Sequence, residues 1–296
     1  MSRFRVVHAT VYRYESTVSS SYGQVCLLPR VMDGQLCHTA SIAVEPAPAD
    51  QSERTDFFGN RVGYFHVERP HELLRITARS EVTIDPAVRT LPLPLEGGRP
   101  LAAIRAAVDG LTGPEAVEAA QHLHDSPRVA ENATVRAYAA KSFRDDRPVV
   151  ECLNDLVERI HDDFEFKPDA TQVTSTIADL FDTGAGVCQD FAHLAVACIR
   201  AAGLPGRYVS GYLETEPPPG KPKVKGADVS HAWASAMIPG VGWIDLDPTN
   251  RQFVNDRYVT TAWGRDYADV APVSGVIYSD GGMSEMEVAV DVTRLP

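Results

Sequence analysis

The chain of 296 residues contains 44% hydrophobic and 23% charged residues, a balance typical of a folded globular protein and not of a disordered chain. Its 40 acidic and 28 basic side chains give a formal net charge of -12, which disfavours a nucleic acid or an anionic membrane as the main partner. No apolar run approaches the roughly 18 residues of a membrane helix, and the first residues lack the apolar stretch of a signal peptide, so a cytoplasmic location is expected.

The first part of the sequence predicts a β domain over residues 1–88. Apolar and aromatic residues alternate with charged ones from Phe4 to Tyr14, which is the period of a half-buried strand. Similar runs at 62–67 and 73–84 are separated by turn residues, as in a small antiparallel sheet. A connector rich in proline and glycine, residues 86–100, then marks a domain boundary.

The second predicted domain, residues 101–296, changes from helices to strands. Apolar residues recur at helical spacing, with prolines at the breaks, over 101–109, 114–123, 131–143 and 148–163. Strand patterns follow at 207–213, 231–238, 243–246 and 286–292. Residues 217–225 are interpreted either as a flap that faces a substrate or as a long hairpin connection. The whole pattern predicts an α+β chain.

Cys188 is the cysteine whose sequence context indicates a reactive thiol. The glycine turn at 184–186 opens onto a helix that is expected to run to Gly203, which places Cys188 in its first turn. The positive end of the helix dipole and the unpaired N–H groups there favour a thiolate. Cys198, on the same helix face but deeper, is expected to pack in the core. Five scattered cysteines without a C-x-x-C pair argue against a disulfide framework and against common zinc sites.

A nucleophilic thiol needs a base, and the base needs an orienting group. His231 begins one predicted strand and Asp247 ends the next, and the tight turn at 239–242 would bring both to the same end of a hairpin. Asp245 shares the strand face of Asp247 and is the rival acid, but the Asp-Pro-Thr context favours Asp247. Each residue also has an ordinary structural interpretation: a buried small side chain for Cys188, a strand-edge contact for His231 and a turn for Asp247.

His193 is interpreted as structural. It follows Cys188 by five residues, which puts it about 140° around the helix from the thiol. The same angle excludes a zinc site made of Cys188, His193 and His231. A dinucleotide loop is excluded too, because Gln189 stands where the third glycine belongs. Arg265 is expected to form a structural ion pair.

Three segments together resemble the core of the bacterial transglutaminase-like superfamily, which has a papain-like arrangement of helices packed on an antiparallel sheet. They are Gly186–Ala192, Ser230–Trp233 and Gly242–Asn250. The N-terminal part resembles the β-rich domain that precedes this core in many bacterial members; the residues that carry this likeness are Tyr12-Arg13-Tyr14, Pro29-Arg30 and Asp56–Arg61. The resemblance implies a catalytic triad of Cys188, His231 and Asp247.

The resemblance further implies acyl transfer on a peptide or amide carbonyl through a thioester. Hydrolysis is the expected outcome, because water needs no dedicated acceptor site. A true protein-glutamine transglutaminase and a non-catalytic binding scaffold remain the alternatives, since this fold serves several functions. The expected partner is a peptide or protein substrate. No metal or organic cofactor is implied, and the oligomeric state stays open.

Overall fold

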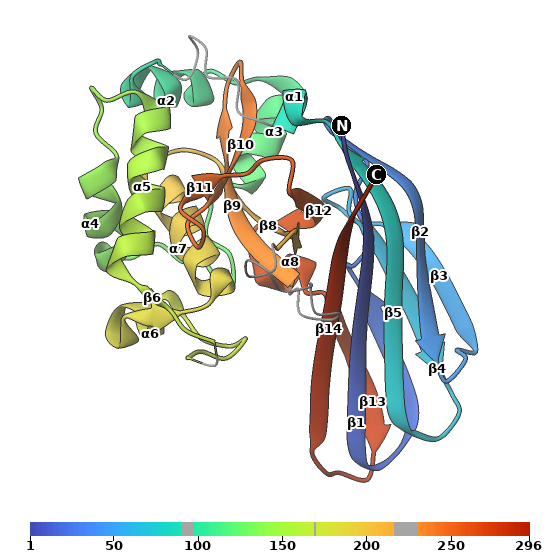
Figure 1. Ribbon diagram of the computed structural model, residues 1–296. Helices are drawn as coiled ribbons and strands as arrows, with labels where there is room; N and C mark the ends of the chain where they lie inside the picture. The colour runs from blue at the N-terminus through green and yellow to red at the C-terminus, as the bar shows by residue number, and fades with distance from the viewer. Residues whose placement is uncertain (90–97, 169, 216–229) are drawn as a thin grey trace, which may run out of the picture.

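The computed structural model describes residues 1–89, 98–168, 170–215 and 230–296, which form an elongated antiparallel sheet beside a helix-covered core (Figure 1). The fold is α+β, as the sequence predicts, with a separate antiparallel sheet in each unit. The predicted loop at 217–225 lies outside the described residues. Among the helices that the structure describes, none is both long and apolar enough to cross a membrane.

The N-terminal sheet is organised by the long strand β1. The members of this sheet are β1 (Ser2–Val25), β2 (Gln35–Glu45), β3 (Asp50–Thr55), β4 (Arg61–Val67), β5 (His71–Ile84), β13 (Val273–Ser279) and β14 (Ser284–Leu295). The first half of β1 pairs with β5 and β14, and the second half pairs with β4 and β13. The register shifts between Arg13 and Val18. The sheet therefore curls, and side chains such as Val25, Phe65 and Ile76 fill its inside.

The last two strands belong to this N-terminal sheet. β14 pairs with β1 from Arg3 to Tyr14, and β13 pairs with the second half of β1. This differs from the expectation that residues 101–296 form one unit, because residues 273–295 complete the first sheet instead. Alternation identifies a strand at 286–292, but it carries no information about which strand will be its partner.

The core is a five-stranded sheet with helices against it. Its strands, in spatial order, are β11 (Gln252–Phe253), β10 (Gly242–Asp247), β9 (Ser230–Ile238), β8 (Gly206–Leu213) and β12 (Tyr258–Gly264). The helices in the described part of the chain are α1 (Pro86–Arg89), α2 (Leu101–Asp109), α3 (Gly113–Gln121), α4 (Ala133–Ser142), α5 (Val149–Asp163), α6 (Ile177–Thr183), α7 (Cys188–Ala201) and α8 (Tyr267–Val270). Two short strands, β6 (Glu165–Phe166) and β7 (Ala185–Gly186), pair in parallel next to the start of α7.

Helix α7 lies in the middle of the core and packs against β8 and β9. Every residue from Gln189 to Arg200 is buried, so the helix has no solvent face along this stretch. β9 presents the small side chains Ala232, Ala234 and Ala236 to the same apolar cluster, which lets the helix lie close to the sheet. Cys198 is fully buried there, as expected. This packing brings the start of α7 to the end of β9 where His231 lies.

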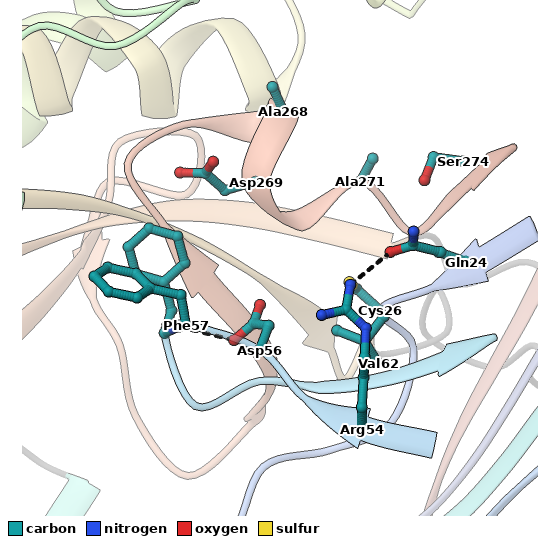
Figure 2. A pocket seen from close by; sticks show the side chains of 11 residues that line it. Gln24, Cys26, Arg54, Asp56, Phe57, Val62, Ala268, Asp269, Ala271 and Ser274 are labelled. Atoms are coloured by element: carbon teal, nitrogen blue, oxygen red, sulfur yellow. Dashed lines mark hydrogen bonds between the residues drawn. The ribbon is translucent and has the colours of Figure 1, made fainter. Parts of the chain in front are cut away.

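A shared apolar cluster joins the two units. Tyr212 of β8 and Val259 of β12 pack against six residues of the N-terminal sheet, namely Phe4, Val6, Val82, Ile84, Val290 and Val292. Nearby, a cleft of about 280 Å³ separates the turn at Asp56 and Phe57 from Ala268 and Asp269 of α8 (Figure 2). The residues that line this cleft do not include Cys188, His231 or Asp247.

Candidate active site

The segment before Cys188 is held in place by local contacts. Helix α6 ends at Gly184, which has a positive φ of 67°, and β7 then pairs with β6. The carboxylate of Asp190 turns back to accept a hydrogen bond from the backbone N–H of Val187 at 2.9 Å and another from the hydroxyl of Thr171 at 2.6 Å. Burial raises the pKa of Asp190 above its usual value, although both hydrogen bonds act in the opposite direction. Cys188 is thereby fixed as the first residue of α7.

Gly186 lies close to the side chains of Asp190 and Leu180 in the same loop. A Cβ atom at this position would lie 2.9 Å from Oδ2 of Asp190 and 2.9 Å from a methyl carbon of Leu180. Both contacts are closer than real Cβ atoms make, so a larger residue would have to displace the carboxylate of Asp190 and the side chain of Leu180. The glycine turn that the sequence placed before Cys188 therefore allows the Asp190 contact that fixes the start of α7.

His231 and Asp247 form a buried pair at one end of the β9–β10 hairpin. Nε2 of His231 lies 2.6 Å from Oδ2 of Asp247, and the two side chains are 7% and 0% exposed. The hairpin register pairs Leu246 with Ala234, which places the end of β10 beside the start of β9. The structure thus brings together the two residues that the sequence predicted to meet at this end of the hairpin.

The charges of this pair support each other. Burial disfavours the charged imidazolium, but the charge and hydrogen bond of Asp247, together with the hydrogen bond and charge of Cys188, raise the pKa of His231 from 6.5 to about 10. Burial likewise opposes ionisation of Asp247, yet His231, Asn250 and Tyr258 hold its pKa below the usual 3.8. The surroundings of His231 therefore favour its charged imidazolium form, with the carboxylate of Asp247 and the Cys188 side chain as the groups that stabilise it.

Asp247 has further hydrogen-bond donors that the sequence analysis missed. Its Oδ1 accepts from the backbone N–H groups of Thr249 at 2.9 Å and Asn250 at 3.2 Å. Its Oδ2 accepts from Nδ2 of Asn250 at 2.7 Å and from the Tyr258 hydroxyl at 2.7 Å. The Asp-Pro-Thr-Asn sequence signals the turn that supplies the first three contacts. No sequence signal points to Tyr258, because β9 and β8 separate its strand β12 from β10 in the sheet, and only its side chain reaches Asp247.

The residues considered as competitors lie elsewhere. Asp245 is opposite Ser235 in the hairpin, away from His231. His193 is buried, and its Nε2 accepts a hydrogen bond from the backbone N–H of Tyr267 at 3.2 Å, in agreement with a structural role. Arg265 forms a two-pronged contact with Asp269, at 2.9 Å for both hydrogen bonds. Within the described ranges, no cluster of three or more His, Cys, Asp or Glu side chains has the arrangement of a metal site.

Family models match most of the two predicted units. The bacterial transglutaminase-like N-terminal region matches residues 4–83, and the transglutaminase-like superfamily model matches residues 136–248, a range that contains Cys188, His231 and Asp247. The chain belongs to the transglutaminase-like superfamily. The resemblance seen in the sequence motifs is confirmed by both matches.

Several known proteins are similar to this member of the superfamily. An uncharacterized protein of Mycobacterium tuberculosis H37Rv is 45% identical over 294 residues, covering 98% of this chain and 92% of the relative. A protein-glutamine γ-glutamyltransferase of Pseudomonas aeruginosa is 37% identical over 98 residues, which is 32% of this chain and 15% of that protein. The solved structure of a Cytophaga hutchinsonii protein, provisionally named a cysteine protease, aligns with a TM-score of 0.74 at 22% identity and covers 100% of this chain and 91% of its own. That likeness establishes the shared fold.

Proposed function

We propose that this protein is a cysteine-dependent acyl-transfer enzyme that hydrolyses a peptide or amide bond, with Cys188, His231 and Asp247 as its catalytic triad. The observation that carries the proposal is the buried 2.6 Å pair of His231 and Asp247 beside Cys188 at the start of α7. A buried imidazolium between a carboxylate and a sulfur is the arrangement that a thiolate nucleophile requires.

The reaction follows from the groups present. The Cys188 thiolate attacks the carbonyl carbon, and the oxyanion that forms lies near the N-terminus of α7, where the Cys188 N–H is a hydrogen-bond donor. His231 gives its proton to the leaving amine, so the C–N bond breaks and a thioester remains. Neutral His231 then takes a proton from water, the hydroxide attacks the thioester, and the acid product leaves as the thiolate and imidazolium form again. Asp247 keeps the ring oriented through both steps.

Labelling of Cys188 with iodoacetamide tests the nucleophile. Cys188 and Cys37 are both partly exposed, while Cys26, Cys152 and Cys198 are buried, so Cys37 serves as the internal control. At neutral pH, peptide mapping should show Cys188 modified faster than Cys37, and His231→Ala should remove that advantage. Equal rates for the two cysteines in the wild-type chain would contradict the proposal.

A transglutaminase is the second candidate, favoured by the local similarity to the Pseudomonas aeruginosa protein-glutamine γ-glutamyltransferase. The two activities differ in the acceptor that resolves the thioester, which is water for a hydrolase and an amine for a transglutaminase. Incubation of the protein with a glutamine-containing peptide library and a fluorescent primary amine separates them. Cleaved peptides or free acids support hydrolysis, whereas covalent incorporation of the amine supports the transglutaminase.

The alternative hypothesis, that the chain is a non-catalytic scaffold, predicts the opposite result for Cys188→Ala. If the chain acts only by binding, this variant should keep the full biological function of the wild type. If the proposal holds, the variant loses all turnover while its fold remains intact, which circular dichroism verifies. Cys37→Ala is the matched control, because it removes a partly exposed thiol from β2, far from α7 in the fold.

A further inference from the structure

Strand β12 is an edge strand of the core sheet, and a buried side-chain amide of the N-terminal unit pairs with its backbone. Oε1 of Gln35 accepts a hydrogen bond from the N–H of Thr260 at 2.8 Å, and its Nε2 donates to the carbonyl of the same residue at 2.8 Å. Nε2 also donates to the carbonyl of Arg30 at 2.9 Å. Gln35 is only 2% exposed, so these contacts replace the hydrogen bonds that a neighbouring strand would supply.

Asn60 makes the equivalent contact three residues along β12. Its Oδ1 accepts from the N–H of Trp263 at 2.9 Å, and its Nδ2 donates to the carbonyl of Trp263 at 2.8 Å. The turn that presents Asn60 is held by Asp56, whose Oδ1 accepts from the N–H groups of Phe58 at 2.9 Å and Asn60 at 2.7 Å. Figure 2 shows Asp56 of this turn on the opposite side of the cleft from α8.

The two amides contact β12 on either side of an irregularity. The pairing of β12 with β8 shifts register between Thr260 and Ala262. At such a bulge one residue is left unpaired and the ladder with β8 is locally disrupted, so contacts on the other side of β12 contribute to fixing its position there. Gln35 fixes the position of Thr260 before the shift, and Asn60 fixes Trp263 after it. The N-terminal unit therefore determines where the irregularity sits.

The beginning of β12 contacts the candidate active site. Tyr258, two residues before Thr260, donates its hydroxyl hydrogen to Oδ2 of Asp247 at 2.7 Å. Gln252 donates in turn to the Tyr258 oxygen at 2.7 Å, which orients the hydroxyl. Val259, between Tyr258 and Thr260, packs in the apolar cluster of the N-terminal sheet. One short strand therefore connects the N-terminal unit to the carboxylate of the pair.

We propose that Gln35 is a positioning residue of the active site: by fixing Thr260 in register, it holds the Tyr258 hydroxyl on Asp247. This inference rests on the proposed function, because it assigns the N-terminal unit a part in catalysis by the triad. Gln35 does not touch the reacting groups and acts through Tyr258.

The test is a double-mutant cycle of Gln35→Met and Tyr258→Phe, read out by iodoacetamide labelling of Cys188 at neutral pH and by the low-field proton NMR signal of the His231–Asp247 hydrogen bond. Each single variant should slow labelling by at least about twofold, the lower end of the coupling between residues in one network, and should move the NMR signal in the same direction. The double variant should be no slower than Tyr258→Phe alone. The inference would be overturned if the two substitutions slowed labelling of Cys188 independently, so that their effects multiplied in the double variant. It would also be overturned if Gln35→Met left the NMR signal unchanged.

Two controls separate positioning from stability. Gln51→Met removes another amide contact of the N-terminal unit, the 2.9 Å hydrogen bond to the Ile42 carbonyl, without touching β12. Val44→Ala weakens the buried core of the N-terminal sheet. Both should leave labelling of Cys188 and the NMR signal as in the wild type. A loss in either control comparable to that in Gln35→Met would show a general stability effect and would contradict positioning.

Hydrogen exchange in the wild-type protein gives a test that needs no variant. The amide hydrogens of Thr260 and Trp263 should exchange as slowly as those of the interior strand β9, because Gln35 and Asn60 accept them. Rapid exchange at both positions would overturn the inference even if Gln35→Met failed to fold. If the wild-type chain itself shows no preferential labelling of Cys188, the proposed function fails; if it does and Gln35→Met is unchanged, only the positioning role fails.

Discussion

Nε2 of His231 lies 2.6 Å from Oδ2 of Asp247 inside a site where both side chains are almost completely buried. A buried charge is costly to leave unpaired, so the two charges are stable only together. Because each charge depends on the other, substitutions in the pair and changes of pH should affect both stability and activity.

Asp247→Asn should remove the charge that keeps His231 protonated. Because Asp247 is the main group that raises the His231 pKa to about 10, the midpoint of His231 should fall by several pH units in the variant. Turnover should fall on the order of 10²- to 10⁴-fold, the contribution typical of acid–base groups. An NMR titration of the His231 ring measures the midpoint. A midpoint that stays near the wild-type value would show that Asp247 is not the cause.

The activity should have an alkaline limit set by His231. The pKa of His231 is raised from 6.5 to about 10, so the imidazolium contributes fully to folding stability below about pH 6.5 and loses that contribution as the pH rises through about 10. The proton for the leaving amine disappears over the same range, so turnover should fall there too. Denaturant unfolding and turnover, each measured from pH 7 to 11, check both statements. His231→Gln should show a flatter stability profile over this range.

Asn250→Ala should make the protein lose folding stability at a higher pH during acidification. Asn250 is one of the groups that hold the Asp247 pKa down, so the variant should raise that pKa. The stability that the Asp247 carboxylate provides is present above its unfolded pKa and is lost on acidification through the lower folded value; in the variant this loss begins at a higher pH. A loss of about 1.5–3 kcal/mol at pH 7 is expected for a hydrogen bond to a charged group. The control is Asn154→Ala, which removes an exposed amide contact to Glu158.

Asp190→Ala should loosen the start of α7. The variant loses the hydrogen bonds from Val187 and Thr171, and a lost cap of this kind costs about 0.5–2 kcal/mol. Because Cys188 follows Val187 directly, labelling of the thiol should slow as well. Thermal unfolding and peptide mapping measure the two effects. Asp182→Ala, an exposed change in the preceding helix, should alter neither.

Gly211→Ala should disrupt the packing between β8, β9 and β12. A Cβ atom there would overlap the carbonyl oxygen of Val259 and lie 2.6 Å from a ring carbon of Trp233. Overpacking of this kind costs about 1–3 kcal/mol or more. Gly110→Ala meets only ordinary contacts from 3.4 Å and has a helical φ of -86°, so it should be neutral or stabilising. Equal unfolding temperatures for the two variants would contradict the packing argument.

Most elements could be predicted from sequence because they depend on local patterns. Prolines and helical spacing place α2 to α5 within a few residues, and short strand-like runs between turn residues place β8, β9 and β10. Cys188, His231 and Asp247 carry short motifs and a tight hairpin turn, so their juxtaposition could be expected as well. The pairing of β14 with β1 could not, because the two strands are separated by almost the whole chain. The contact of Gln35 with Thr260 joins residues 225 positions apart and leaves no local trace in the sequence. The Tyr258 hydroxyl meets Asp247 only 11 positions away, but across two intervening strands of the sheet, which no local pattern indicates.

The return of β13 and β14 to β1 makes the helical core an insertion within the β unit. During synthesis, β1 emerges from the ribosome before the helical core, yet its partners on one side, β13 and β14, are made after that core. The edge of β1 that pairs with them stays open while the whole core is translated and folds. A chain that stops before β13 would keep that open edge permanently, and exposed strand edges pair readily with other chains. Completion of the last two strands therefore protects the newly made protein against aggregation, beyond what they add to the stability of the finished fold.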